Sequence, residues 1–191
     1  MATTVLSTSR LVTRELPPAA APRVAAFLKE NWHFHRQWEP LRDDAYFSVG
    51  EQRKRLRFIR SAGDAIHFWV FLRETGSRGS GWRDKPLIGS ITLTSIVRGF
   101  FQNAFLGYKV DARHARRGYM SEAIREVLTY AFETLELHRI EANVMPNNVA
   151  SRGLLERLGF RDEGVAKSYL KIQGRWEDHT HMVLLSEERR R

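Results

Sequence analysis

The segment that decides the fold reads Arg113-His114-Ala115-Arg116-Arg117-Gly118-Tyr119-Met120-Ser121-Glu122-Ala123. It follows a strand-like run that ends at Val110 and precedes a helical pattern that ends near Leu137. Within that pattern, apolar residues recur at spacings of three and four: Ala123, Ile124, Val127, Leu128, Ala131, Phe132 and Leu135. The segment is therefore predicted to carry the chain from a strand into the start of a helix.

The chemistry of this turn favours an anion. The first turn of a helix has free backbone N–H groups and lies at the positive end of the helix dipole. Three arginines and one histidine share the turn, so a phosphate site is predicted there. A basic loop that is merely solvated can have the same composition as this turn. The order of the sequence motifs that follow the turn is what favours a phosphate site.

Length and composition limit the class of protein. The 191 residues suit one domain, 1–191, with a frayed tail near 186–191. The chain has no cysteine, which excludes thiolate metal sites and cysteine nucleophiles. The seven histidines show no spacing typical of a metal site, so no metal is expected.

The charge balance points to an acidic partner. The formal net charge is +9 and the pI is near 10.3, which favours encounter with phosphate-bearing molecules such as a polyphosphorylated cofactor or ribosomal RNA. No apolar run is long enough to span a bilayer and the first residues lack a signal-peptide pattern. We therefore expect a cytoplasmic protein with no membrane partner.

The order of patterns predicts the architecture. Strands are expected at 10–14, 66–72, 87–97, 104–110, 139–144, 160–172 and 176–185, and helices at 19–31, 50–62, 118–137 and 149–158. Three successive strands joined by turns indicate an antiparallel meander. A meander followed by β-α-β predicts an α/β fold with a mixed sheet of about seven strands and helices on both faces.

At this point the chain resembles the GCN5-related N-acetyltransferases, the GNAT family. A motif of that family reads arginine or glutamine, two residues, glycine, one residue, then glycine or alanine. In this sequence Arg113 takes the first place of the motif and Gly118 the last. The likeness continues through Glu122-Ala123, Pro146-x-Asn148-x-Ala150-Ser151 and Leu158-Gly159-Phe160. The resemblance implies acetyl transfer from acetyl-coenzyme A (acetyl-CoA) and central strands that splay apart to form its cleft.

Further segments are similar to ribosomal-protein-alanine acetyltransferases of the RimJ type. They are Asn31-Trp-His-Phe, Trp38-Glu-Pro40, Val97-Arg-Gly99, His138 to Asn143, and Gly164 to His179. This resemblance implies that the acceptor is the N-terminal alanine of a small-subunit ribosomal protein. Contact with the ribosome or its RNA would suit the positive charge, and the protein is expected to be a monomer or a homodimer.

The family resemblance also assigns the cofactor contacts. The pantetheine arm is expected along the strand that ends at Val110, and the pyrophosphate on the turn and the helix start. The residues expected to bind the cofactor are Tyr108, Val110, Asp111, Arg113, Arg116, Arg117, Gly118, Tyr119, Met120, Ser121, Asn148 and Ser151. Arg116 stands where the family has its first glycine, and we interpret that position as needing close backbone approach and not a positive φ.

Three residues are candidates for catalysis. Ser151 is expected to protonate the departing sulfur, because related ribosomal acetyltransferases place a serine there. Asn148 is expected to be both a helix N-cap and a cofactor contact. Ser168 occupies the place of a carboxylate found in relatives, so Glu141 is the candidate base, with Asp178 and Glu39 as alternatives; a water relay could also serve.

The acceptor site is expected to involve Trp38, Glu39 and Tyr169. Two other functions stay open from the residues. Glu39, Asp43 and Asp44 would suit a cationic small amine, such as a polyamine or an aminoglycoside. A non-catalytic, ribosome-associated factor that uses this fold for binding alone would bind RNA with a steep dependence on salt.

Overall fold

The computed structural model describes residues 3–73 and 82–188. The segment between the strands expected at 66–72 and 87–97 therefore falls largely outside the described residues, as do the last three arginines of the expected frayed tail. No helix in the described ranges is long and apolar enough to cross a membrane.

A single sheet of eight strands organises the molecule, in the order β1-β2-β3-β4-β5-β6-β8-β7. All neighbours are antiparallel except β5 and β6, which are parallel. The strands are β1 (Val5–Ser7), β2 (Leu11–Glu15), β3 (Ile66–Leu72), β4 (Leu87–Val97), β5 (Asn103–Val110), β6 (Arg139–Val144), β7 (Arg161–Ile172) and β8 (Arg175–Leu185). The mixed, mostly antiparallel sheet and its meander are confirmed.

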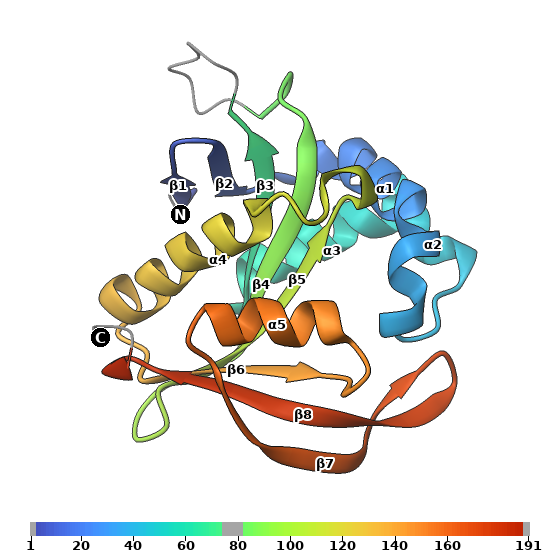
Figure 1. Ribbon diagram of the computed structural model, residues 1–191. Coiled ribbons are helices and arrows are strands. Elements are labelled where there is room, and N and C mark those ends of the chain that lie inside the picture. The colour runs from blue at the N-terminus through green and yellow to red at the C-terminus, as the bar shows by residue number, and fades with distance from the viewer. Residues whose placement is uncertain (1–2, 74–81, 189–191) are drawn as a thin grey trace.

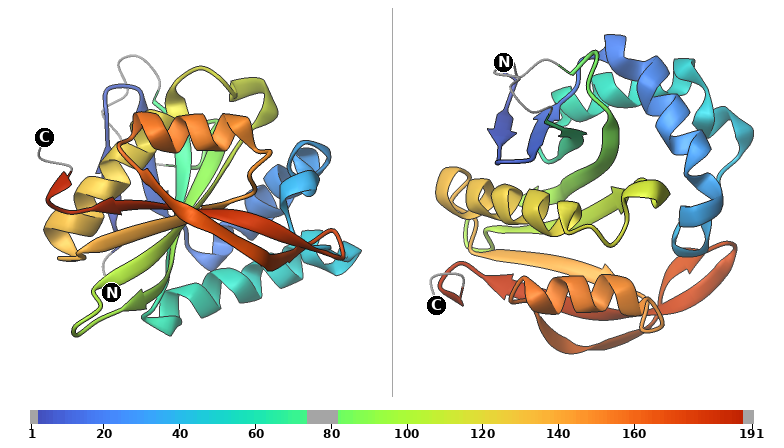
Figure 2. Two further views of the ribbon diagram at one scale, coloured as in Figure 1. Left: turned by 60° about the horizontal axis from the view of Figure 1, so that its bottom comes forward. Right: turned by 45° about the horizontal axis from the view of Figure 1, so that its top comes forward.

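The helices cover both faces, as predicted (Figures 1 and 2). The α-helices are α1 (Ala21–Glu30), α2 (Trp32–His35), α3 (Val49–Ala62), α4 (Tyr119–Thr129) and α5 (Val149–Arg157). Short 3₁₀ turns are η1 (Pro18–Ala20), η2 (Arg36–Trp38), η3 (Asp44–Phe47) and η4 (Ala112–His114), and a π-helical turn, η5 (Tyr130–Thr134), extends α4.

Two hydrophobic cores follow from this layering. One lies between the sheet and the pair α4 and α5, and it includes the predicted helical stripe at Ala123, Ile124, Val127 and Leu128. The other packs α1 and α3 against Trp69 and Phe71 on the opposite face of β3. Residues that alternate along a strand therefore point to different cores.

Two expectations about the elements need correction. The sheet has eight strands and not about seven, because Val5–Ser7 pairs with β2; three residues are too short to show an alternating pattern. The helix expected to run from 118 to 137 changes to π-helix at Tyr130, where Leu135 N–H reaches the carbonyl of Tyr130, five residues back, at 3.0 Å.

Candidate active site

The sheet opens between its two parallel strands. Strands β5 and β6 pair through only three register partners, of which Phe105 and Glu141 are the last. Beyond that pair β5 stays bonded to β4 and β6 to β8, while the two strands diverge from each other. The expected splay is present, and it leaves alternate backbone groups of β5 beyond Phe105 facing the gap. The Val110 carbonyl at the end of this stretch accepts from His35 Nε2 at 2.8 Å.

The basic turn lies at the carboxyl end of β5, above this gap. The chain passes through η4, and Gly118, with φ +76°, is the N-cap of α4. The first i→i−4 bond of the helix runs from Glu122 N–H to the Gly118 carbonyl at 3.1 Å. The amides of residues 118–121 precede that bond, so they point outward without an intrahelical acceptor, which is the geometry of an anion site.

The prediction that position 116 needs close backbone approach and not a positive φ was wrong. The φ of Arg116 is +61°, in the left-handed region where a Cβ is disfavoured by about 1–2 kcal/mol. The turn therefore needs a positive φ at this position as well as at Gly118, and arginine is strained there. Arg116 also adds a positive charge two positions before Gly118, the N-cap of α4.

Asp111 supports the turn from inside. Its side chain is 2% exposed, and its Oδ1 accepts from the Arg113 backbone N–H at 2.9 Å and from Arg113 Nε at 3.0 Å. His114 Nδ1 lies 3.1 Å from the same oxygen, and Asn31 Nδ2 donates to Oδ2 at 3.3 Å. The Arg113 guanidinium, together with His114 and Asn31, holds the pKa of Asp111 well below its usual range.

This arrangement changes how Arg113 can act. Its guanidinium is committed to Asp111 at 2.8 Å and lies 3.8 Å from Glu30. The arginine thus shapes the turn, and its charge toward a phosphate is already balanced in part. Arg116 and Arg117, the other predicted basic contacts, are exposed, as is the Arg113 side chain at 74%.

Arg10, which lies between β1 and β2, also contacts this turn, and sequence reasoning missed it. Arg10 pairs with Glu122 at 2.5 Å, donates to the Arg117 carbonyl at 3.4 Å, and lies 4.7 Å from the centre of the Tyr119 ring. Thr8 also hydrogen-bonds Glu122. Residues 112 positions apart meet here, so no local pattern could have revealed the contact.

Ser151 faces the gap from the first turn of α5. Its backbone N–H donates to Asn148 Oδ1 at 3.1 Å, so Asn148 is the predicted N-cap. Its hydroxyl lies 2.6 Å from the hydroxyl of Tyr108 on β5. Burial raises the pKa of Tyr108 to about 12, so this phenol keeps its proton at neutral pH.

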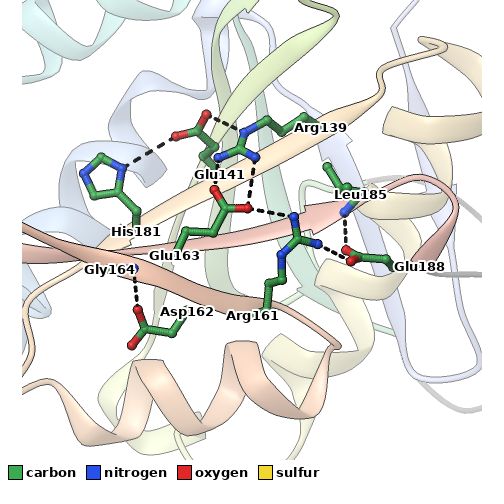
Figure 3. A network of polar contacts seen from close by, with 9 residues as sticks. All are labelled: Arg139, Glu141, Arg161, Asp162, Glu163, Gly164, His181, Leu185 and Glu188. Carbon is green, nitrogen blue, oxygen red and sulfur yellow. Dashed lines mark hydrogen bonds and ion pairs between the residues drawn. The ribbon is translucent and has the colours of Figure 1, made fainter.

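A polar cluster occupies the other face of the sheet beside the gap. Ile140 and Ala142 point into the core under α4 and α5, so Glu141 and Asn143 point to the opposite face. Asn143 Nδ2 donates to the hydroxyl of Tyr169 at 3.2 Å. Glu141 is buried, accepts from Arg139 Nε at 2.8 Å, and lies 3.9 Å from His181 Nδ1 (Figure 3).

Glu39 joins three parts of the chain on this face. Its carboxylate pairs with Lys109 of β5 at 2.8 Å and with Arg42 at 3.7 Å. Its carbonyl accepts from Gln173 Nε2 at 3.0 Å, at the tip of the β7–β8 hairpin. The predicted acceptor residue Glu39 is thus tied to the hairpin that carries Tyr169, while Trp38 next to it is half-buried.

The remaining candidate carboxylates are less suited to take a proton. Asp178 is paired with Lys167 at 2.8 Å, and this lysine lowers the pKa of Asp178. Asp43 caps η3 by accepting from Tyr46 N–H at 3.0 Å.

Comparison with known proteins decides the family. The model of the acetyltransferase (GNAT) domain matches residues 10–161. The chain belongs to the GNAT family. It is therefore an acetyl-CoA-dependent acyltransferase.

Two curated proteins are similar to this GNAT chain along most of its length. It is 39% identical over 185 residues to the probable N-acetyltransferase YjcK of Bacillus subtilis, which covers 95% of this chain and 97% of YjcK. It is 37% identical over 182 residues to the [ribosomal protein uS5]-alanine N-acetyltransferase of Escherichia coli, covering 94% and 89%.

A solved structure is also similar to this chain along most of its length. Mycobacterium smegmatis RimJ in complex with CoA-disulfide superposes with a TM-score of 0.84 at 26% identity, covering 97% of this chain and 88% of that one. The residues of this GNAT protein fit the same cofactor, because free amides at the start of α4 suit a pyrophosphate and the gap beside β5 suits an extended arm.

Proposed function

We propose that this enzyme acetylates the N-terminal α-amine of a protein, the N-terminal alanine of a small-subunit ribosomal protein. The observation that carries the proposal is the 37% identity, across 94% of the chain, to a protein named for that reaction. The polar cluster on the face opposite α4 and α5 gives the proposal a place for the acceptor.

The first part of the mechanism is positioning. The amides at the start of α4, with Arg116, Arg117, Tyr119, Met120 and Ser121 around them, would hold the pyrophosphate, and Tyr108, Val110 and Asp111 would border the arm. Acetyl-CoA supplies an activated thioester when it is bound. Holding the thioester beside an oriented amine provides a large part of the rate enhancement.

The second part is proton transfer at Ser151. The Ser151 hydroxyl, on the cofactor side of the gap, would give its proton to the departing sulfur. The Tyr108 hydroxyl at 2.6 Å remains protonated at neutral pH and can donate to the Ser151 oxygen as its charge develops. Asn148 fixes the start of α5 and so the position of Ser151.

The third part is removal of a proton from the amine. Glu141, the base expected from the sequence, lies in the polar cluster on the face opposite α4 and α5, where it would act directly or through a neighbour, and Trp38, Glu39 and Tyr169 would border the acceptor. An N-terminal amine has a pKa of about 7.7–8.0, so a large fraction is neutral near pH 8 and the demand on a base is modest. A cationic polyamine fits this face less well, because Glu39 and Asp43 are already partnered.

The deciding experiment uses labelled acetyl-CoA. The full-length enzyme is incubated with separated small- and large-subunit ribosomal proteins, and the products are identified by mass spectrometry of their N-termini. We expect one dominant product, a small-subunit protein acetylated on its N-terminal alanine. Label that enters only spermidine or an aminoglycoside, or ribosome binding with no acetyl transfer, would contradict the proposal.

A further inference from the structure

Two neighbouring buried polar atoms, one on β6 and one on β8, have no hydrogen-bond partner in the part of the chain that the structure describes. Asn143 on β6 and His181 on β8 are register partners. Asn143 Oδ1 and His181 Nε2 are both buried, and neither has a hydrogen-bond partner among residues 3–73 and 82–188. An unsatisfied buried polar atom costs about 1–3 kcal/mol, so two neighbouring residues with such atoms indicate a ligand that supplies what is missing.

The surrounding contacts show that the missing groups are donors. The amide nitrogen of Asn143 is occupied by the Tyr169 hydroxyl at 3.2 Å, which leaves Oδ1 as an acceptor. His181 Nδ1 faces the Glu141 carboxylate at 3.9 Å (Figure 3). That carboxylate favours a proton on Nδ1, so Nε2 carries the lone pair.

A neutral primary amine matches this pair of acceptors. It has two N–H groups and one lone pair, so it can donate to Asn143 and His181 and still attack with its lone pair. We propose that His181 Nε2 accepts the proton of the incoming α-amine, an inference that rests on the function proposed above. Asn143 Oδ1 holds the second N–H, and Glu141 is a positioning residue that acts through His181.

The step balances without another reactant. The amine nitrogen forms a bond to the acetyl carbon while the carbon–sulfur bond breaks. The nitrogen loses one proton to His181 Nε2, and the sulfur gains one from Ser151, which recovers it through Tyr108 or water. His181 then returns its proton to water, so the products are an amide and a thiol with no net change in charge.

The charges around His181 suit this role. The Glu141 carboxylate on β6 lies 3.9 Å from His181 Nδ1, and Arg139 binds the other Glu141 oxygen at 2.8 Å. Arg139 is balanced in turn by Glu163 of β7 at 2.6 Å. The other titratable groups that face His181 are Tyr169, whose ring centre is 4.9 Å away, and His179, the next residue on the same face of β8.

Tyr169 covers the site from an irregular part of β7. The pairing of β7 with β8 shifts between Ala166 and Leu170, and Ser168 inside that stretch has φ +49°. Asp178 Oδ1 fixes the bulge by accepting from Ser168 N–H at 2.9 Å. A bulge can redirect a side chain out of the regular alternation, and here it places Tyr169 against Asn143 and His181.

The test compares His181→Gln and His181→Ala with a matched surface variant, His138→Gln, because His138 is 55% exposed. The acceptor is a hexapeptide that begins with alanine, and kcat and KM are measured from pH 6 to 9.5 with coenzyme A affinity from calorimetry. We expect His181→Gln to lower kcat roughly 100-fold and to remove the acid limb of the kcat profile, whereas kcat/KM keeps an acid limb from protonation of the acceptor amine. Coenzyme affinity and thermal midpoint should be unchanged, and added imidazole should restore part of the activity of His181→Ala.

Glu141→Gln separates positioning from direct proton transfer. It should lower kcat about 10-fold and leave a shifted acid limb, because His181 remains. The proposal is wrong if His181→Gln keeps wild-type kcat and the acid limb. It is also wrong if Glu141→Gln abolishes that limb while His181→Gln does not. If the wild-type enzyme uses spermidine in place of the peptide, the proposed acceptor is wrong, and the same variants assayed on spermidine still decide the role of His181.

Discussion

At the scale of single residues, the proposed proton donor Ser151 and its neighbour Tyr108 come from distant parts of the chain. The two hydroxyls come from α5 and β5 and meet at 2.6 Å beside the gap. A serine alone is a weak acid. In the proposed mechanism, the phenol next to it, which keeps its proton because its pKa is about 12, would make donation from Ser151 easier.

The first prediction separates these two hydroxyls. Ser151→Ala should lower kcat roughly 100-fold with little effect on coenzyme affinity, because it removes the proton donor and leaves the amide cradle intact. Tyr108→Phe should have a smaller effect, about 10-fold, because Ser151 remains. Steady-state kinetics and calorimetry on both variants check this, and wild-type kcat in Ser151→Ala would end the acid role of Ser151.

Asp111 gives a prediction about pH and stability. Its folded-state pKa is lowered, chiefly by Arg113, below the unfolded value of about 3.9. The stabilisation is therefore fully present above about pH 4 to 5 and is lost as the pH falls through the folded-state pKa. Asp111→Asn should cost about 2 kcal/mol at pH 7, and the difference from wild type should shrink in acid.

Urea unfolding at pH 7, 4 and 2.5 measures this difference, because the stabilisation is lost only below the unfolded-state pKa of about 3.9. Glu51→Gln is the control, because Glu51 forms an exposed pair with Arg55 one turn along α3, and such pairs contribute about 0.5 kcal/mol or less. A constant difference between wild type and Asp111→Asn at all three pH values would show that the Asp111 charge is not the source of the stabilisation.

At the scale of elements, the start of α4 is held in place by close packing as well as by charge. A Cβ added at Gly89 of β4 would lie 2.6 Å from the Lys109 carbonyl oxygen and 2.7 Å from Met120 Cε. The absence of a side chain there lets β5 and the first turn of α4 approach β4. The same approach sets the position of the amide cradle relative to the gap.

Gly89→Ala should therefore act on both stability and binding. The backbone contact cannot be relieved by a side-chain rotation, so overpacking should cost about 1–3 kcal/mol and move Met120, which weakens coenzyme binding. Gly50→Ala is the matched control, because a Cβ there meets nothing within 4 Å and should stabilise α3 by about 0.5–1 kcal/mol. Thermal unfolding and calorimetry check both variants, and normal coenzyme affinity in a destabilised Gly89→Ala would separate the cradle from this packing.

At the scale of the whole molecule, the opening between β5 and β6 divides one sheet into two halves. Apart from the three register pairs at the start of the strands, the halves are joined by side-chain contacts, such as Tyr108 with Ser151 and Glu39 with Gln173. A ligand that fills the gap and bonds to both halves should therefore stabilise the entire fold.

Coenzyme A at 100 times its dissociation constant should stabilise the protein by about 2.7 kcal/mol. For a chain of this size that corresponds to a rise of roughly 5–10 °C in Tm. Arg117→Glu should reduce the rise at the same coenzyme concentration, whereas Arg53→Glu on α3, on the opposite face, should not. Scanning calorimetry measures the rise, and equal rises in both variants would contradict a role for the basic turn in binding.

The amino-acid sequence by itself determined the elements and the turn. The spacing of apolar residues located β3 and β6 at their observed bounds and the buried face of α4, because local periodicity decides which side of an element is buried. The short strand β1 and the π-helical end of α4 carry no such signal. The family likeness pointed to the splayed strands and to Asn148 and Ser151.

Tertiary structure alone decided which side chains meet. It paired Arg113 with Asp111, Arg10 with Glu122, Tyr108 with Ser151, and His181 with Glu141. It also showed that Arg116 has a positive φ. The physical reason is that these contacts depend on strand register, on the splay of β5 from β6 and on a bulge in β7. Those features arise from packing across the whole sheet, and residues close in sequence do not encode them.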